Sequence, residues 1–208
     1  MYSKYIKRIL DIGGSFLAII ICIPFFMIIS LFVRIKLGRP ILFKQLRVSK
    51  NNHIFTMYKF RTMKDIRDAN GNLLPNELRQ TRFGSFLRST SLDELPELWN
   101  ILKGDISFVG PRPLIPEYLP YYTEYELQRH KVRGGLIPPE VLYDDITPAW
   151  QQQFEYEVYY ASHVSFLLDL KIMIASLKGI FKRNAIRYGN YNRESFFQER
   201  RDTTKKED

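Results

Sequence analysis

The sequence predicts an α+β protein that is mainly helical, contains one small β-hairpin and is attached to a membrane through its N-terminal segment. Three observations predict this class: an uncharged apolar run of 22 residues at positions 12–33, two short β-type stretches after it, and helical periodicity along the rest. The 208 residues are 45% hydrophobic and 25% charged. That composition excludes general disorder, and the length allows one domain with a sizeable core.

The N-terminal apolar run has two possible arrangements in a membrane. As a straight helix, residues 12–33 would be roughly 33 Å long, just enough to cross a bilayer. Basic residues flank both ends, so a span would leave one cluster on the non-cytoplasmic side, against the positive-inside bias. Pro24 lies near the middle, where it would kink the helix. A bent helix that re-enters the same leaflet satisfies both observations, and the residues alone leave the two arrangements open.

A β-hairpin is expected next, because residues 41–48 and 53–63 have strand composition and are joined by a polar turn of four residues. The stretch 91–104 has leucines near the helical period and ends at Gly104, and a brief apolar strand is expected at 106–109. Other expected helices are 79–89, 117–129, 148–161 and 164–183. The last of these is apolar on most faces but carries five charges, so it packs in the core by default or lies in the membrane interface.

Charge and cysteine content exclude several functions. The chain has 31 Lys and Arg against 22 Asp and Glu, a formal charge of +9, and its first 64 residues hold 12 basic residues and one acid. The excess cations therefore flank the apolar run, and the remainder carries −2 with no groove-reading motif, which argues against nucleic-acid binding. The single Cys22 excludes a disulfide framework and a zinc site built from several thiolates.

The adjacent acids Asp93 and Glu94 are candidates for chemistry. A structural interpretation is that Ser91 and Glu94 form a capping box at the start of a helix. A helix start is also a place where backbone N–H groups favour phosphate. Two carboxylates there could hold Mg²⁺ that bridges to substrate phosphate, or one could attack phosphorus while the other binds metal or manages a proton.

Arg112 lies between Pro111 and Pro113 on a stiff turn, which would order its long side chain at reduced entropic cost. A guanidinium group suits a phosphate or a uracil–ribose edge, although a proline-rich turn with an incidental arginine explains the pattern equally well.

Histidines are scattered and suggest neither a metal site nor a triad. Other basic residues that could meet a phosphate are Lys59, Arg61, Arg79, Arg82 and Arg88.

Taken together and in order, several motifs make the chain resemble the bacterial sugar transferase family, the small monotopic phosphoglycosyl transferases. The resemblance runs over residues 2–133 and resumes at 154–182. No single motif decides the matter, but the ordered set is highly specific. The motifs are Lys7-Arg8 with Asp11, Tyr58-Lys59-Phe60-Arg61-Thr62-Met63, Arg88-Ser89-Thr90-Ser91-Leu92-Asp93-Glu94-Leu95-Pro96, Leu102-Lys103-Gly104-Asp105 and Val109-Gly110-Pro111-Arg112-Pro113.

The resemblance implies that a sugar-1-phosphate moves from a UDP-sugar to polyprenol (undecaprenyl) phosphate, with release of UMP, as the first membrane step of glycoconjugate or polysaccharide assembly. It implies that Asp93 is the nucleophile that forms a covalent phosphosugar intermediate, that Glu94 assists, and that both lie at a Mg²⁺ site. It also implies a re-entrant helix broken at Pro24. The implied phosphate- and nucleotide-binding positions are Lys59, Arg88 and Arg112, with Pro111 and Pro113 beside the last.

The expected organisation is a basic-flanked re-entrant membrane helix at 1–36, a catalytic domain with interfacial helices at 37–186 and a polar tail at 187–208. The resemblance implies a monotopic protein of the bacterial inner membrane, in contact with membrane lipids, with its active site on the cytoplasmic face. The sequence leaves the oligomeric state open, a homo-oligomer included. The alternative function is that of a membrane-anchored, non-catalytic interaction protein.

The chain departs from the family's pattern at two places. Ile23 precedes the helix-breaking proline where the family often has Ser. After Arg133, the usual Pro-Gly-Ile-Thr-Gly run is replaced by residues 134–145, which contain a double proline and the acidic pair Asp144 and Asp145. If the family's run contributes to sugar or nucleotide contacts, an unusual donor is expected here, and we hypothesise that an amino-bearing sugar pairs with Asp144 or Asp145.

Overall fold

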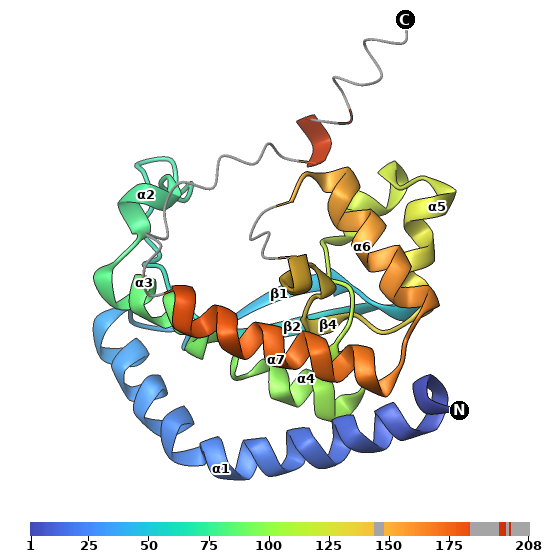
Figure 1. Ribbon diagram of the computed structural model, residues 1–208. Helices are drawn as coiled ribbons and strands as arrows, with labels where there is room; N and C mark the ends of the chain where they lie inside the picture. Colours follow the sequence, from blue (N-terminus) through green and yellow to red (C-terminus); the bar gives the residue numbers. More distant parts are fainter. Residues whose placement is uncertain (144–147, 184–195, 199, 201–208) are drawn as a thin grey trace, which may run out of the picture.

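A long N-terminal helix lies along one side of the small α+β body in the computed structural model, which describes residues 1–143, 148–183, 196–198 and 200 (Figure 1). Helix α1 (Lys7–Lys36) follows a π-helical turn, Tyr2–Ile6, and bends part-way along without interruption at Pro24, which lies inside it. It is long and apolar enough to cross a membrane by length and composition. Most of its apolar side chains are exposed, so an apolar surface is available to lipid.

Both ends of α1 are attached to the body by polar contacts. Near its start, buried Asp11 accepts hydrogen bonds through Oδ1 from Ser107 Oγ at 2.9 Å and Phe108 N at 3.1 Å. Arg8 donates to the last carbonyls of helix α4 (Glu97–Lys103), where a cation is favoured by the helix dipole. Arg61 donates to carbonyls just past the end of α1. Helix α1 is therefore attached to the body at both ends.

The predicted hairpin is confirmed. Strands β1 (Leu42–Val48) and β2 (Ile54–Phe60) pair antiparallel with Leu42 opposite Phe60, and a 3₁₀ turn, Lys50–Asn52, connects them. Phe55 and Met57 of β2 are buried against apolar residues of α4, because alternation places them on the same face. The hairpin thus supplies one wall of the core beneath the site.

The single helix expected over 91–104 is wrong in its first half. Ser91 adopts a left-handed conformation with φ of 55° and makes no side-chain cap, so the predicted capping box is absent. A 3₁₀ turn, Leu92–Glu94, comes first, and α4 begins only after Pro96. Its end is as expected, because Gly104 has a φ of 95°.

The second half of the body contains elements that the sequence pattern did not separate. Strand β3 (Ser107–Val109), close to the expected 106–109, pairs in parallel with β4 (Gly135–Ile137), which was not expected. The helix expected over 117–129 is wrong as one element: two 3₁₀ turns, Pro116–Tyr121 and Gln128–Lys131, flank α5 (Glu124–Leu127). Thr123 starts α5 with a complete capping box. The remaining helices are α2 (Asn76–Arg79), α3 (Arg82–Ser89), α6 (Trp150–Ser162) and α7 (Phe166–Arg183).

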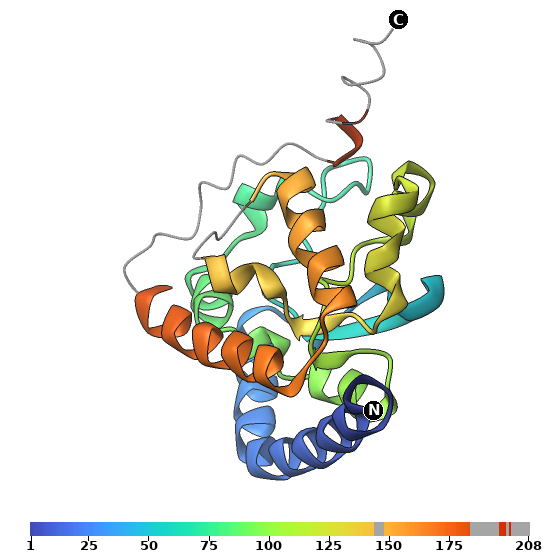
Figure 2. The ribbon, with the colours of Figure 1, turned by 45° about the vertical axis from the view of Figure 1, so that its right-hand side comes forward.

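Helix α7 runs beside the body on the same side as α1 (Figures 1 and 2). Ile172 is fully buried, and Asp169 accepts short contacts from Lys7 Nζ and Tyr160 Oη, both at 2.6 Å. The expected core packing therefore holds for only one face of α7. Its exposed apolar residues include Phe166, Leu167, Leu170, Met173, Ile174 and Leu177.

Candidate active site

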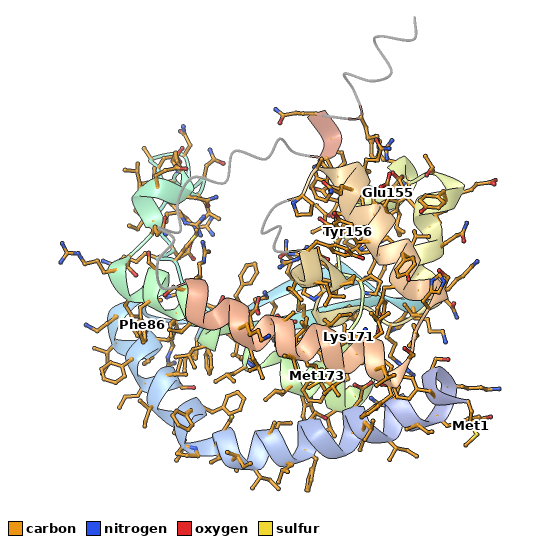
Figure 3. The ribbon with its side chains drawn as sticks, viewed as in Figure 1. Met1, Phe86, Glu155, Tyr156, Lys171 and Met173 are labelled. Atoms are coloured by element: carbon orange, nitrogen blue, oxygen red, sulfur yellow. The ribbon has the colours of Figure 1, made fainter. Side chains whose placement is uncertain are left out.

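A cleft of about 1810 Å³ opens between the hairpin, α3, the turn before α4 and α7. Five of the residues expected at the site line it, which brings together side chains that are up to 53 positions apart in the sequence. Met173 of α7, labelled in Figure 3, lines the same cleft from the membrane-helix side. The five are Lys59, Arg88, Asp93, Glu94 and Arg112.

Other expected site residues are placed differently. Pro111 and Pro113 are buried and are not among the residues that line the cleft, so they hold the backbone of Arg112 rather than face a ligand. Pro24 is exposed on α1. Asp144 and Asp145 lie outside the described residues.

Asp93 occupies the 3₁₀ turn before α4, and only 8% of its surface is exposed. Burial, followed by the charge of Glu94, raises the pKa of Asp93 to about 6, although Lys59 and Arg88 act in the opposite direction. At neutral pH this carboxylate is still mainly ionised, yet it is poorly solvated. A desolvated carboxylate beside cations is suited to attack an electrophilic phosphorus atom.

Glu94 is connected to a third carboxylate, Glu97, through Lys59. The Lys59 ammonium lies 2.7 Å from Glu94 Oε1 and 3.1 Å from Glu97 Oε1. Burial alone would lower the pKa of Lys59, but the two carboxylates outweigh it and raise that pKa. Burial raises the pKa of Glu97 to about 7. Lys59 therefore orients the acids as well as facing the cleft, and Glu97, four residues after Asp93, was missed by the sequence reasoning.

Arg88 is ordered by a hydrogen bond from its Nε to Thr62 Oγ1 at 3.0 Å. Its charge favours the ionised form of Asp93, because it lowers the pKa that burial raises. Helix α3 presents Arg88 in its last turn, and Thr81 caps the start of that helix by accepting from Gly84 N at 3.0 Å. Arg88 thus occupies a fixed place beside the nucleophile candidate.

The backbone of Arg112 is held on both sides by a buried ion pair. Glu157 of α6 accepts from Arg112 N at 2.8 Å and lies 2.7 Å from the Arg129 guanidinium, which in turn donates to Arg112 O. Both Glu157 and Arg129 are fully buried. The Arg112 side chain itself stays accessible to solvent in the cleft. The sequence pattern gave no signal for this pair, because its members come from separate elements.

The carboxylates near Arg112 determine the direction in which its pKa shifts. Surrounding protein alone would lower the pKa of Arg112, but acids led by Glu140 and Glu94 outweigh this effect and raise it. The negative charges that act on Arg112 therefore come from two segments: Glu94 in the turn before α4, and Glu140 after β4. A guanidinium that is accessible in the cleft can bind a phosphate group.

The chain matches the family model described as "Bacterial sugar transferase" over residues 2–183. It belongs to the bacterial sugar transferase family. The uncharacterized sugar transferase EpsL of Bacillus subtilis (strain 168) is 41% identical over 187 residues, covering 89% of this chain and 92% of that protein. The exopolysaccharide production protein PSS of Rhizobium leguminosarum bv. phaseoli is 32% identical, covering 83% of this chain and 93% of that protein.

A longer relative has a more specific name. The UDP-glucose:undecaprenyl-phosphate glucose-1-phosphate transferase of Klebsiella pneumoniae is 32% identical over 190 residues, covering 86% of this chain but 41% of that protein. Membership of the sugar transferase family makes the protein an enzyme rather than a non-catalytic anchor. The expected sugar transferase resemblance is therefore confirmed.

Asp93 and Glu94 fit a magnesium ion that relies on water and substrate for most of its ligands. After burial, the charge of Glu94 is the next cause that raises the pKa of Asp93, and a cation between the two carboxylates would relieve that repulsion. Within the described part of the chain, no three acidic, histidine or cysteine side chains form a metal cluster. Mg²⁺ commonly binds through one or two carboxylates together with substrate phosphates, so the pair is sufficient.

Proposed function

We propose that this sugar transferase moves a sugar-1-phosphate from a UDP-sugar to polyprenol (undecaprenyl) phosphate and releases UMP. The observation that carries the proposal is the position of Asp93, a buried carboxylate in a cleft that it shares with Arg88, Lys59 and Arg112. The printed names of relatives such as the Klebsiella pneumoniae enzyme support the donor and the acceptor.

In the first step, an Asp93 carboxylate oxygen attacks the phosphorus that bears the sugar. The new bond joins Asp93 to that phosphorus, the phosphoanhydride bond to the uridine phosphate breaks, and UMP leaves with the bond's electron pair. Arg88 and Arg112 offer cations for the phosphoryl oxygens, where negative charge must be stabilised while an anion attacks. Glu94, held by Lys59, is available to manage a proton.

In the second step, a phosphate oxygen of the lipid attacks the same phosphorus. The Asp93–phosphorus bond breaks, the free carboxylate returns, and the product is a polyprenyl diphosphate sugar. Mg²⁺ held by Asp93 and Glu94 would supply charge neutralisation for the diphosphate of the donor. The two displacements need only one site, because both reactions occur at one phosphorus atom.

The membrane arrangement is part of this proposal. We infer that α1 enters and leaves the cytoplasmic leaflet with its bend near Pro24, so that both basic flanks face anionic headgroups. The exposed apolar face of α7 would lie in the interface on the same side. A site next to these two helices can meet a lipid phosphate at headgroup depth.

Covalent capture tests the chemical step. Detergent-purified protein is incubated with Mg²⁺ and a panel of UDP-sugars, without lipid acceptor, and UMP and the protein mass are measured. One equivalent of UMP and a sugar-phosphate adduct on the peptide that contains Asp93 are expected. Asp93→Asn should give neither, whereas Glu155→Gln on the exposed face of α6 should give both. A folded wild-type protein that releases no UMP with any donor would overturn the proposal.

Topology is tested through the single cysteine. In a Cys22→Ser background, Ser3→Cys and Lys36→Cys place one thiol at each end of α1. A membrane-impermeant maleimide added to intact spheroplasts should label neither site, and both should react after the membrane is opened. Labelling of one site in intact cells would mean that α1 spans the bilayer.

A further inference from the structure

One buried carboxylate at the cleft is not used by the proposed reaction. Glu140 lies in the 3₁₀ turn Pro139–Tyr143, lines the cleft and is 6% exposed. Its Oε2 atom is buried and has no hydrogen-bond partner among the residues that the structure describes. A buried carboxylate oxygen without a partner costs free energy, so its presence at a substrate cleft needs a reason.

The turn that carries Glu140 is held firmly. Tyr143 at the end of the turn stacks on Tyr156 of α6, with ring centroids 3.8 Å apart and planes 9° from parallel. This contact holds the end of the turn against α6, and the terminal torsion of the Glu140 carboxylate is soft enough to turn an oxygen toward a ligand.

Neighbouring charges do not satisfy Glu140. The charges of Arg112 and Arg129 and one backbone hydrogen bond favour its ionised form, and the charge of Glu157 opposes it. Arg129 is already paired with Glu157 at 2.7 Å, and Glu157 also accepts from Arg112 N. Burial and the charge of Glu157 raise the pKa of Glu140 to about 7, as expected of an acid that its neighbours leave unsatisfied.

We propose that Glu140 recognises the donor by accepting a hydrogen bond from an N–H or O–H group of the nucleotide sugar. Arg112 is acted on by acids of the turn before α4 and by Glu140, so a diphosphate held by Arg112 with its reacting phosphorus at Asp93 brings one end of the donor toward Glu140. A UDP-sugar can donate there from its nucleoside end, through the imide N–H of uracil or a ribose hydroxyl, or from its sugar end, through a hydroxyl or amino group. The inference rests on the proposed reaction and assigns one contact within it.

The test uses Glu140→Gln, which keeps the shape of the side chain but removes its charge and one acceptor. We expect the KM for the UDP-sugar to rise roughly tenfold, the loss of one charge-assisted hydrogen bond, while the KM for polyprenol phosphate stays within about twofold. Glu155→Gln, on the exposed face of α6, is the matched control and should change neither constant (Figure 3). A merely structural defect would affect donor and acceptor alike.

Product inhibition separates the two ends of the donor. If the nucleoside makes the contact, the inhibition constant of UMP rises in Glu140→Gln by the same factor as the donor KM. If the sugar makes it, UMP inhibition is unchanged and the preference among UDP-sugars shifts instead. Unchanged donor KM, UMP inhibition and sugar preference in folded Glu140→Gln would overturn the inference. The proposed reaction would still stand as long as the wild-type protein releases UMP through Asp93.

Discussion

Replacing the nucleophile candidate, Asp93→Asn, is expected to abolish activity and to stabilise the protein at neutral and higher pH. The reason is that folding moves this carboxylate into a site where its ionised form is unfavourable. Asn has nearly the same shape but no charge to desolvate. Loss of activity with a gain of stability distinguishes a strained functional residue from a structural one.

The magnitude follows from the shift in pKa, from an ordinary 3.8 to about 6. About two pKa units correspond to about 3 kcal/mol in the free energy of unfolding. Below about pH 4 the carboxyl is protonated in both the folded and the unfolded state, so the wild-type protein has no penalty there. The penalty grows as the pH rises toward 6 and is complete above it, because the unfolded chain then releases its proton more readily than the folded one.

Thermal unfolding in detergent, followed at pH 4.5 and pH 8, measures this effect. At pH 8 the Asn variant should unfold about 6–12 °C higher than the wild type, given about 2–4 °C per kcal/mol for a chain of this length. At pH 4.5 only about a third of the difference, about 1 kcal/mol, should remain. Glu155→Gln, exposed on α6, should change stability by less than about 0.5 kcal/mol at both pH values. Equal or lower stability of Asp93→Asn at pH 8 would refute the electrostatic reasoning.

Three further predictions concern Asp93, Lys59 and Asp11. The kcat/KM for the donor should fall about tenfold per pH unit below about 6, because protonated Asp93 is no nucleophile; a pH–rate profile measures it. Lys59→Met should lower the free energy of unfolding by about 3 kcal/mol in urea, because buried Glu97 loses its cation. Asp11→Ala should lower it by about 2 kcal/mol in the same assay, because two buried donors of β3 lose their acceptor.

Each of these three predictions has its own control and contradicting outcome. A flat pH–rate profile between pH 5 and 7 would mean that Asp93 is ionised throughout or is not the nucleophile. Lys59→Met combined with Glu97→Leu should recover most of the lost stability, and no recovery would separate the two residues energetically. Asp11→Asn keeps an acceptor and should cost less than Asp11→Ala; equal costs would show that the hydrogen bonds to β3 do not matter.

Local patterns predicted the parts of the fold that depend on local physics. Alternating strand residues around a polar turn gave the hairpin, and Gly104 ended α4 because a left-handed residue was needed there. The capping box at Ser91 failed because Pro96 and the left-handed Ser91 favour a 3₁₀ turn before the helix. Sequence spacing alone does not distinguish these two helix starts. Strand β4 was missed because three residues paired to a distant strand leave no periodic signal.

The candidate site was predicted where a motif concentrates chemistry and missed where tertiary packing creates it. Asp93 and Glu94 are adjacent, so their pairing was visible in the sequence. Glu97, Glu140 and Glu157 were not, because each becomes significant only through burial beside a cation from another element. Lys59 illustrates the difference: it was expected to bind phosphate, and it lines the cleft, but its contacts with Glu94 and Glu97 were not foreseen.

The distribution of charge in the folded protein differs from the distribution along the sequence. Eight basic residues line the cleft against four acidic ones, although the chain after residue 64 carries −2. Half of these cations, Lys44, Arg47, Lys59 and Arg61, belong to the basic first third, and the other half, Arg67, Arg79, Arg88 and Arg112, come from the remainder.

Folding therefore gathers cations in the cleft from a region that is acidic on average. This matters for the proposed chemistry, because a carboxylate anion must attack a phosphate that is itself negative, and a lipid phosphate must follow it. A local excess of positive charge offsets both repulsions and draws both substrates to one place. In the proposed membrane arrangement, the basic flanks of α1 and the cationic cleft would both lie near anionic lipid headgroups and the lipid phosphate among them.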